Sequence, residues 1–279
     1  MHVAIIGIGL IGGSVARDLR RTGFATRLTG VGSTPARAEI ALRLGLVDRV
    51  TTLETAVREA DLVVLAIPVD RAVKLLPQVL DLVDRQTVTD MGSTKQAIVA
   101  AVRHHPRRNR FVASHPMAGT ENSGPAAAMD HLFEGKVAVL CDLADSEPDA
   151  VKNVEAFYTT LGMRLVRMDA ATHDLHAAYV SHLSHVVSYA LALTTLEKEK
   201  DDNAIFALAG GGFASAARLA KSAPDMWVPI FRQNRTAVLD AIDTYQQKLQ
   251  ALRAAIADGD DTRIRALIEE ANRIRRILP

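Results

Sequence analysis

Two polar side chains follow short expected strands at positions where they could take part in proton transfer. His115 follows the expected strand Phe111–Ser114, and Ser93 follows the expected strand Thr87–Thr89. Pro116 biases residue 115 toward an extended backbone, so we expect its imidazole to project from a strand end. An imidazole there can accept a hydroxyl proton near neutral pH, as hydride removal from an alcohol carbon requires. The alternatives are a buried structural role for His115 and a helix-capping role for Ser93.

A glycine-rich turn lies close to the N-terminus. The sequence Gly7-Ile8-Gly9-Leu10-Ile11-Gly12 follows a first apolar run and opens a helical stretch. In this setting the GxGxxG spacing is typical of a dinucleotide-binding loop, because the first glycine permits a tight turn, the second lets a pyrophosphate approach the backbone, and the third lets helix and strand pack closely. We therefore expect a dinucleotide to contact Gly7, Gly9, Leu10, Ile11, Gly12 and, after the run Asp61–Ile67, Pro68.

The choice between NADP and NAD is predicted from the absence of an acidic residue where the adenosine ribose is expected. An Asp or Glu that binds the ribose is expected about 20 residues past the loop, but that point is Gly32 and no acid lies in residues 30–37. Ser33, Thr34 and Arg37 are placed to bind a 2′-phosphate instead. We expect NADP, with NAD as the alternative, and a solvated helix position is the alternative for Arg37.

The second half of the chain carries histidines and an arginine that could face a substrate. At about 100° per residue, His173 and His176 lie on one side of a straight helix and His182 and His185 on the other, so no metal site is expected. His182 and His185 share a face and either line a polar pocket or cover a core. Arg218 follows three consecutive glycines and suits a carboxylate held bidentately, with a surface position as the alternative.

The elements that must position these residues fall into two groups. Apolar runs alternate with helical stretches in the first group, and apolar runs without polar alternation are typical of strands covered on both faces. The expected strands are 3–6, 28–31, 61–67, 87–89, 111–114, 136–140 and 164–166, and the expected helices are 11–21, 35–44, 69–83, 95–103 and 151–161. From residue 170 onward the spacing is helical, with helices expected over 174–196, 204–220, 227–253 and 260–277.

This pattern predicts an α/β fold: a Rossmann-type, mostly parallel sheet domain over residues 1–168, followed by an all-helical dimerisation domain over residues 169–279. A helical segment of this size often completes its core with a second copy, so a homodimer is expected.

The composition of the chain excludes some classes of function. The chain has 33 Lys and Arg against 32 Asp and Glu, a formal charge of +1, which argues against a general nucleic-acid binder. No apolar run reaches the roughly 18 residues of a membrane span and no signal peptide is evident, so we expect a cytoplasmic protein.

Taken together, these motifs resemble the prephenate dehydrogenase family, which includes arogenate dehydrogenases. The resemblance covers nearly the whole chain and rests on GIGLIGGS at 7–14, DMGSTK at 90–95, SHPMAGTENSG at 114–124, LFEGK at 132–136, SHLSH at 181–185 and GGGFASAARLAKSAPDMW at 210–227. It departs from relatives at 214–217, where an aspartate is common and this chain has Ala-Ser-Ala-Ala.

The resemblance implies oxidative decarboxylation of prephenate to 4-hydroxyphenylpyruvate with hydride transfer to NAD(P), in tyrosine biosynthesis. His115 would accept the ring hydroxyl proton and Ser93 would orient it. Four residues would bind the substrate: Arg218 a carboxylate, His185 the side chain, and Thr120 and Glu121 the pocket wall. Arogenate is the alternative substrate. Tyrosine is a possible inhibitor and, because the chain ends at Pro279 without a regulatory segment, would act in the active site. A β-hydroxyacid dehydrogenase is a further alternative, but Lys198, Lys200 and Lys221 lie in no matching motif.

Overall fold

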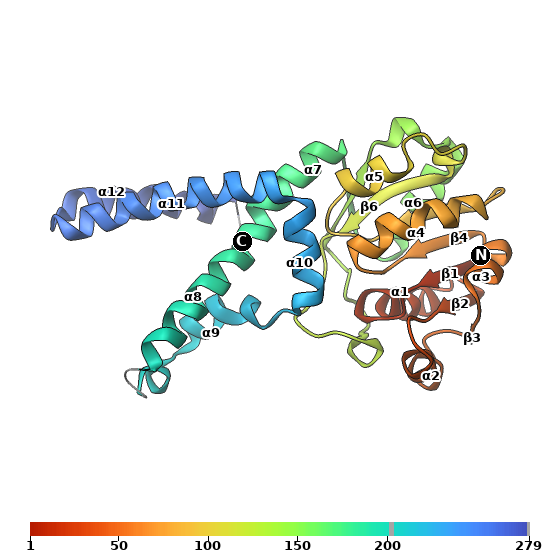
Figure 1. The fold of residues 1–279 in the computed structure, drawn as a ribbon, viewed down its shortest axis with the longest axis horizontal. Coiled ribbons are helices and arrows are strands. Elements are labelled where there is room, and N and C mark those ends of the chain that lie inside the picture. The colour runs from red at the N-terminus through yellow and green to blue at the C-terminus, as the bar shows by residue number, and fades with distance from the viewer. Residues whose placement is uncertain (201–203, 278–279) are drawn as a thin grey trace.

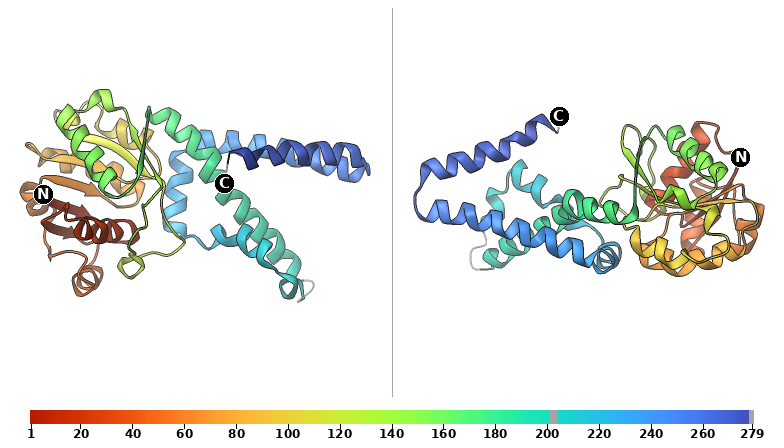
Figure 2. Two further views of the ribbon diagram at one scale, coloured as in Figure 1. Left: turned by 180° about the vertical axis from the view of Figure 1, so that it is seen from behind. Right: turned by 90° about the horizontal axis from the view of Figure 1, so that it is seen from above.

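A computed structural model describes residues 1–200 and 204–277 of the chain. Figure 1 shows a sheet-containing part at the N-terminal side and a set of long helices extending from it. The two parts meet around helices α7 and α10, and the views of Figure 2 show that the long helices project away from the sheet rather than covering it.

The first part is built around one eight-stranded sheet. Its strand order is β3-β2-β1-β4-β5-β6-β7-β8, and every neighbouring pair is parallel except β6 and β7. This confirms the predicted mostly parallel sheet. The strands are β1 His2–Ile6, β2 Arg27–Val31, β3 Arg49–Val50, β4 Leu62–Leu65, β5 Thr87–Asp90, β6 Phe111–Pro116, β7 Val137–Cys141 and β8 Arg164–Met168.

Helices on both faces explain why the central strands are apolar throughout. In β1, Val3 and Ile5 belong to one buried cluster while Ala4 and Ile6 belong to the other, because successive side chains point to opposite faces of a strand. The helices of this part are α1 Leu10–Arg21, α2 Pro35–Arg43, α3 Leu53–Glu59, α4 Val69–Asp81, α5 Gln96–Val102 and α6 Pro148–Thr160.

Two predictions about this part were incomplete. The two-residue strand β3 and the seven-residue helix α3 were not predicted. Strand β6 continues to Pro116, so His115 lies within the strand, opposite Val139 of β7, rather than after it. The end of β6, which includes His115, pairs with the antiparallel strand β7, whereas the parallel strand β5 pairs only with the beginning of β6.

The second part contains helices only, among the residues described. They are α7 Ala170–Ala177, α8 Leu183–Glu199, α9 Gly211–Ala217, α10 Pro224–Gln233, α11 Arg235–Ala257 and α12 Asp261–Asn272, with a turn of π-helix over Ala178–His182. Figure 1 shows α8 and the α11–α12 pair as two arms that diverge from α10. No described helix is long and apolar enough to cross a membrane.

Two long helices expected here are interrupted. The π turn separates α7 from α8 within the expected helix 174–196, and the expected helix 227–253 breaks at Asn234. The break has a packing reason. The buried Asn234 amide donates to the backbone oxygen of Asp174 at 2.6 Å and lies 3.1 Å from Nδ1 of His182, so it ties α10 and α11 to the segment that carries the histidines.

Candidate active site

Three loops that carry residues singled out from the sequence lie at one edge of the sheet. Strands β1, β4 and β5 are parallel, so the loops that follow them meet beyond their carboxyl ends. These are the glycine loop, the turn at Pro68 and the segment from Met91 to Lys95. The strand order reverses between the neighbours β1 and β4, and ligands of doubly wound sheets bind at such a point.

The glycine loop has the geometry expected for a dinucleotide pyrophosphate. Gly7 has φ +96°, and a Cβ there would lie 2.5 Å from the backbone oxygen of Ala66. A Cβ on Gly12 would collide with the backbone oxygen of Gly7, so this glycine allows α1 to pack on the strand. At Gly9, by contrast, no described atom lies within 4 Å of the position a Cβ would take. The loop therefore offers free space beside the N-terminus of α1, whose first-turn amides have no partner within the helix.

The side chains of Leu10 and Ile11, two residues expected at the dinucleotide, pack into the core of the sheet part. The Leu10 side chain is buried in the core, and Ile11 packs against the same cluster. At the other end of the expected cofactor site, Ser33, Thr34 and Arg37 are exposed around the start of α2, and the Thr34 hydroxyl accepts from the backbone N–H of Arg37 at 3.3 Å. This start of a helix, without an acid, has the chemistry of an anion site.

His115 is buried, and its Nδ1 lies 2.8 Å from Nε2 of His173 on α7. Burial, with contributions from His173, Lys95 and His182, holds the pKa of His115 well below its ordinary value. The imidazole is therefore neutral near pH 7 and can accept a proton. Since Nδ1 is engaged by His173, Nε2 is the atom available to a substrate.

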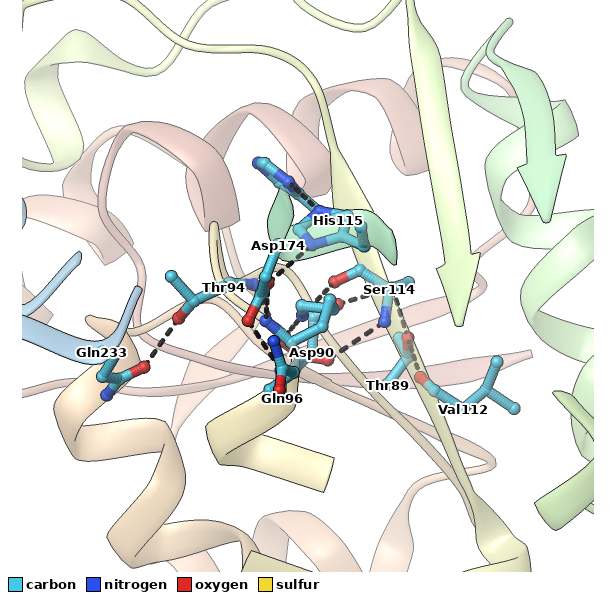
Figure 3. A network of polar contacts seen from close by, with 12 residues as sticks. Thr89, Asp90, Thr94, Gln96, Val112, Ser114, His115, Asp174 and Gln233 are labelled. Carbon is cyan, nitrogen blue, oxygen red and sulfur yellow. Dashed lines mark hydrogen bonds and ion pairs between the residues drawn. The ribbon is translucent and has the colours of Figure 1, made fainter. Parts of the chain in front are cut away.

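A buried ion pair fixes the strand end that carries His115. The ammonium of Lys95 is fully buried, pairs with Asp90 at the end of β5 and donates to the backbone oxygen of Ser114 at 2.6 Å. The Asp90 carboxylate also accepts from the backbone N–H of Ser114 at 3.1 Å and of Gly92 at 2.8 Å. Figure 3 shows this network joining β5 to β6. Sequence reasoning did not identify it, although the two charged residues are the first and last residues of the quoted motif DMGSTK.

The cap of α5 comes from the helical part. The N-cap position is Lys95, and the Asp174 carboxylate of α7 accepts from the backbone N–H of Lys95 at 2.7 Å and of Gln96 at 3.0 Å. The helix-capping alternative for Ser93 is therefore wrong, and Ser93 lies half-buried in the loop before the helix. A second cross-link, from the Thr94 hydroxyl to Oε1 of Gln233 at 2.6 Å, joins the same loop to α10 (Figure 3).

The four residues expected at the substrate form two groups: Arg218 with Glu121 and Thr120, and His185 on its own. The guanidinium of Arg218, which is exposed, lies 3.3 Å from the carboxylate of Glu121 in the loop after β6, next to Thr120. The ring of His185 stacks on Trp227 with 3.5 Å between centroids, and its Nδ1 lies 3.1 Å from the backbone oxygen of Ser181. Burial lowers the pKa of His185, and Arg218 adds to this effect. Arg218 thus lies close to both the loop after β6, through Glu121, and His185.

Among residues 1–200 and 204–277, no group of three or more His, Cys, Asp or Glu side chains could hold an ion. Three of the four histidines of the helical part make other contacts: His173 contacts His115, while His182 and His185 both pack against Trp227. Trp227 itself is buried in a small apolar cluster with Val69 and Ile230.

Comparison with known proteins identifies two family profiles. Residues 15–167 match a profile described as prephenate dehydrogenase, nucleotide-binding domain, and residues 169–270 match prephenate dehydrogenase, dimerization domain. Among curated proteins, the chain is 31% identical to the prephenate dehydrogenase of Bacillus subtilis, over 99% of this chain and 76% of that protein. It is 33% identical to the cyclohexadienyl dehydrogenase of Zymomonas mobilis, over 98% of this chain and 94% of that protein.

Solved structures agree with these matches. A prephenate dehydrogenase from A. aeolicus, crystallised with hydroxyphenyl propionate and NAD+, superposes with a TM-score of 0.88 at 31% identity, covering 100% of this chain and 99% of that chain. Arogenate dehydrogenase from Synechocystis superposes with a TM-score of 0.79 at 28% identity, covering 100% of both chains.

Proposed function

Since the chain belongs to the prephenate dehydrogenase family, we propose that it oxidises and decarboxylates prephenate to 4-hydroxyphenylpyruvate, with hydride transfer to a nicotinamide dinucleotide, in tyrosine biosynthesis. The observation that carries the proposal is the position of His115. It is a neutral, buried imidazole with one ring nitrogen engaged by His173, and it lies at the sheet edge where the glycine loop leaves room for a dinucleotide.

The chain's own residues would divide the chemistry as follows. His115 accepts the proton of the ring C4 hydroxyl through Nε2, and Ser93 orients that hydroxyl. Arg218 binds a substrate carboxylate, His185 contacts the side chain, and Thr120 and Glu121 line the pocket. The nicotinamide, when bound, accepts the hydride from C4. Loss of the ring carboxylate as carbon dioxide makes the ring aromatic, so the protein mainly positions groups and holds the proton.

For the cofactor we propose NADP rather than NAD. The support is the exposed start of α2, where Ser33, Thr34 and Arg37 offer hydroxyl, amide and guanidinium donors and where residue 32 is glycine instead of an acid. A carboxylate at that point would repel a 2′-phosphate and bind the hydroxyl of NAD. The proposed phosphate-binding loop suits both cofactors: Gly7, Gly9, Leu10, Ile11 and Gly12 would surround the pyrophosphate, and Pro68 would contact the dinucleotide from the turn after β4.

A specific feature keeps arogenate as a second candidate substrate. Arogenate carries an ammonium where prephenate carries a ketone. The Glu121 carboxylate beside Arg218 would attract that ammonium and offset the guanidinium charge that favours a carboxylate. Tyrosine carries the same alanyl group as arogenate, with its ammonium and carboxylate, and would then compete for this pocket. Its action as an inhibitor remains a prediction.

One kinetic experiment tests these proposals together. Initial rates are measured by absorbance of the reduced cofactor for prephenate and arogenate, each with NAD and NADP. We expect turnover of prephenate with NADP to give the highest kcat/KM of the four. Higher kcat/KM with arogenate would reassign the substrate, and higher kcat/KM with NAD would reassign the cofactor. Absence of turnover in all four combinations, with folded protein, would exclude the proposed activity.

A further inference from the structure

We propose that Asp174 and His173 act behind His115 as a relay, which fixes the nitrogen that carries its proton and takes up the positive charge when His115 accepts the substrate's proton. The inference rests on the function proposed above. Oδ1 of Asp174 lies 2.8 Å from Nδ1 of His173, and Nε2 of His173 lies 2.8 Å from Nδ1 of His115. The three residues are 1%, 2% and 7% exposed, so water does not compete for these contacts.

The order of donors along this chain follows from Asp174. An ionised carboxylate only accepts hydrogen bonds, so Nδ1 of His173 is the donor to it. A neutral His173 then has a lone pair on Nε2, which accepts from Nδ1–H of His115. His115 is left with its lone pair on Nε2, the nitrogen that is free for the substrate hydroxyl. The network thus selects the tautomer that a proton acceptor needs.

Asp174 is held firmly enough to define this order. Its two carboxylate oxygens accept from the backbone N–H groups of Lys95 and Gln96, and its backbone oxygen accepts from the side chain of Asn234. Asp174 and His173 lie on α7 of the helical part, whereas His115 lies on β6 of the sheet (Figure 3). The relay is therefore complete only when the two parts are packed together.

The relay also resolves an energetic difficulty at His115. The titratable groups that face it are the ammonium of Lys95, which is paired with Asp90, and the imidazoles of His173 and His182; burial and these neighbours lower the pKa of His115. A lone imidazole in this position would accept a proton poorly.

Transfer along the relay removes the charge from His115. The substrate O–H bond breaks and an N–H bond forms at Nε2 of His115. The N–H bond at Nδ1 of His115 then breaks, and one forms at Nε2 of His173. The result is a neutral His115 and an imidazolium at His173 directly beside the Asp174 carboxylate, where a buried charge is paired.

His173→Gln is the sharpest test of the relay. The glutamine oxygen can accept from Nδ1–H of His115, but the side chain cannot carry a proton. We expect kcat to fall roughly 10–100-fold, comparable with loss of an outer partner of a metal-bound histidine, while KM for both substrates changes little. Without Asp174 compensating the charge, protonated His115 is less stable. The acid limb of the kcat profile should therefore move to lower pH, by about one unit or more.

His176→Gln is the matched control, because His176 lies on the same helix, is exposed and is outside the network. It should leave kcat and the acid limb unchanged. Asp174→Asn should shift the limb in the same direction as His173→Gln, since it removes the compensating charge. If the His173 variant loses activity with the limb in place, or keeps full activity, the pair is only a packing contact and the relay is wrong.

A second measurement is independent of turnover. Proton NMR of the full-length protein should show a strongly downfield imidazole N–H that exchanges slowly and disappears in His115→Asn. Its nitrogen, assigned with 15N-labelled histidine, should be Nδ1. An Nε2–H tautomer for His115 would overturn the relay. If the wild-type protein turns over neither cyclohexadienyl substrate, the proposed function fails while this experiment still decides the relay.

Discussion

The imidazole of His115 has to be shielded from water and still be ready to accept a proton. Its place in β6, opposite Val139 and beside the buried Lys95–Asp90 pair, provides the shielding. The contact with His173 leaves Nε2 for the substrate. A side chain with these properties should be far more important for the chemical step than for holding the cofactor.

His115→Asn tests this role at the scale of one residue. Asparagine is close in size and can still hydrogen-bond His173, but it cannot accept the hydroxyl proton. We expect kcat to fall by roughly 10²–10⁴-fold, the usual contribution of general base catalysis. Cofactor affinity, measured by fluorescence titration, should stay near that of the wild type. A kcat close to the wild-type value would remove His115 from the chemistry.

Sequence reasoning located some site residues better than others. Pro116 was enough to predict the extended backbone at His115, because the restriction is local. The contact between His115 and His173 spans 58 residues and joins a strand to a helix, so no spacing within one helix could reveal it. Lys95 was missed for a different reason. A fully buried lysine is rare, and it is tolerable here because it pairs with Asp90 at the end of β5 and donates to the backbone oxygen of Ser114.

At the scale of elements, most strands could be predicted from the sequence, because a strand that lies between two apolar clusters carries apolar side chains on both faces. Leu62–Leu65 is fully apolar because alternate side chains enter different clusters. Strand β3 has two residues and α3 has seven, too short for either periodicity to show. The π turn over Ala178–His182 could not be predicted, since it depends on contacts with Asn234 and Trp227 from helices far along the chain.

The burial of His182, in the π turn, makes the free energy of unfolding depend on pH. Burial lowers the pKa of His182 from 6.5 to about 4 in the folded protein. Between these values the unfolded chain binds the proton more tightly, so the free energy of unfolding falls as pH drops from 6.5 toward 4. At 1.36 kcal/mol per unit the loss is about 3 kcal/mol. Urea denaturation across this range should show a smaller pH slope for His182→Gln than for the wild type, and equal slopes would contradict the assignment.

The turn between β2 and α2 should decide cofactor choice. Gly32→Asp places a carboxylate where the adenosine ribose is expected, and like charges would then repel a 2′-phosphate. We expect the ratio of kcat/KM for NADP to that for NAD to fall by roughly 10–100-fold. Initial rates with both cofactors measure it. An unchanged ratio would mean that residue 32 does not face the ribose and that the NADP proposal lacks its support.

For the whole molecule, the contrast between the two parts is informative. The sheet part encloses two extensive apolar clusters, whereas the buried clusters of the helical part contain few residues. Its diverging arms, α8 and α11–α12 (Figure 1), instead expose large apolar side chains, with Leu193 67% and Ile256 65% exposed. Outside the arms, Val180 in the π turn is 68% exposed, and Leu208, between α8 and α9, is 88% exposed. Apolar surface of this kind, on a segment that matches a dimerization domain, favours burial against a second copy.

We therefore expect a homodimer in which the arms of two chains pack together. Sedimentation should give twice the 30.1 kDa mass of one chain. Placing charges on both arms with Leu193→Asp and Ile256→Asp should shift the equilibrium toward monomer, because each buried unpaired carboxylate costs about 3–5 kcal/mol. Leu42→Asp, at an exposed leucine of α2, is the control and should leave the dimer intact. Wild-type protein that sediments as a monomer at micromolar concentration would show that the arms are solvated.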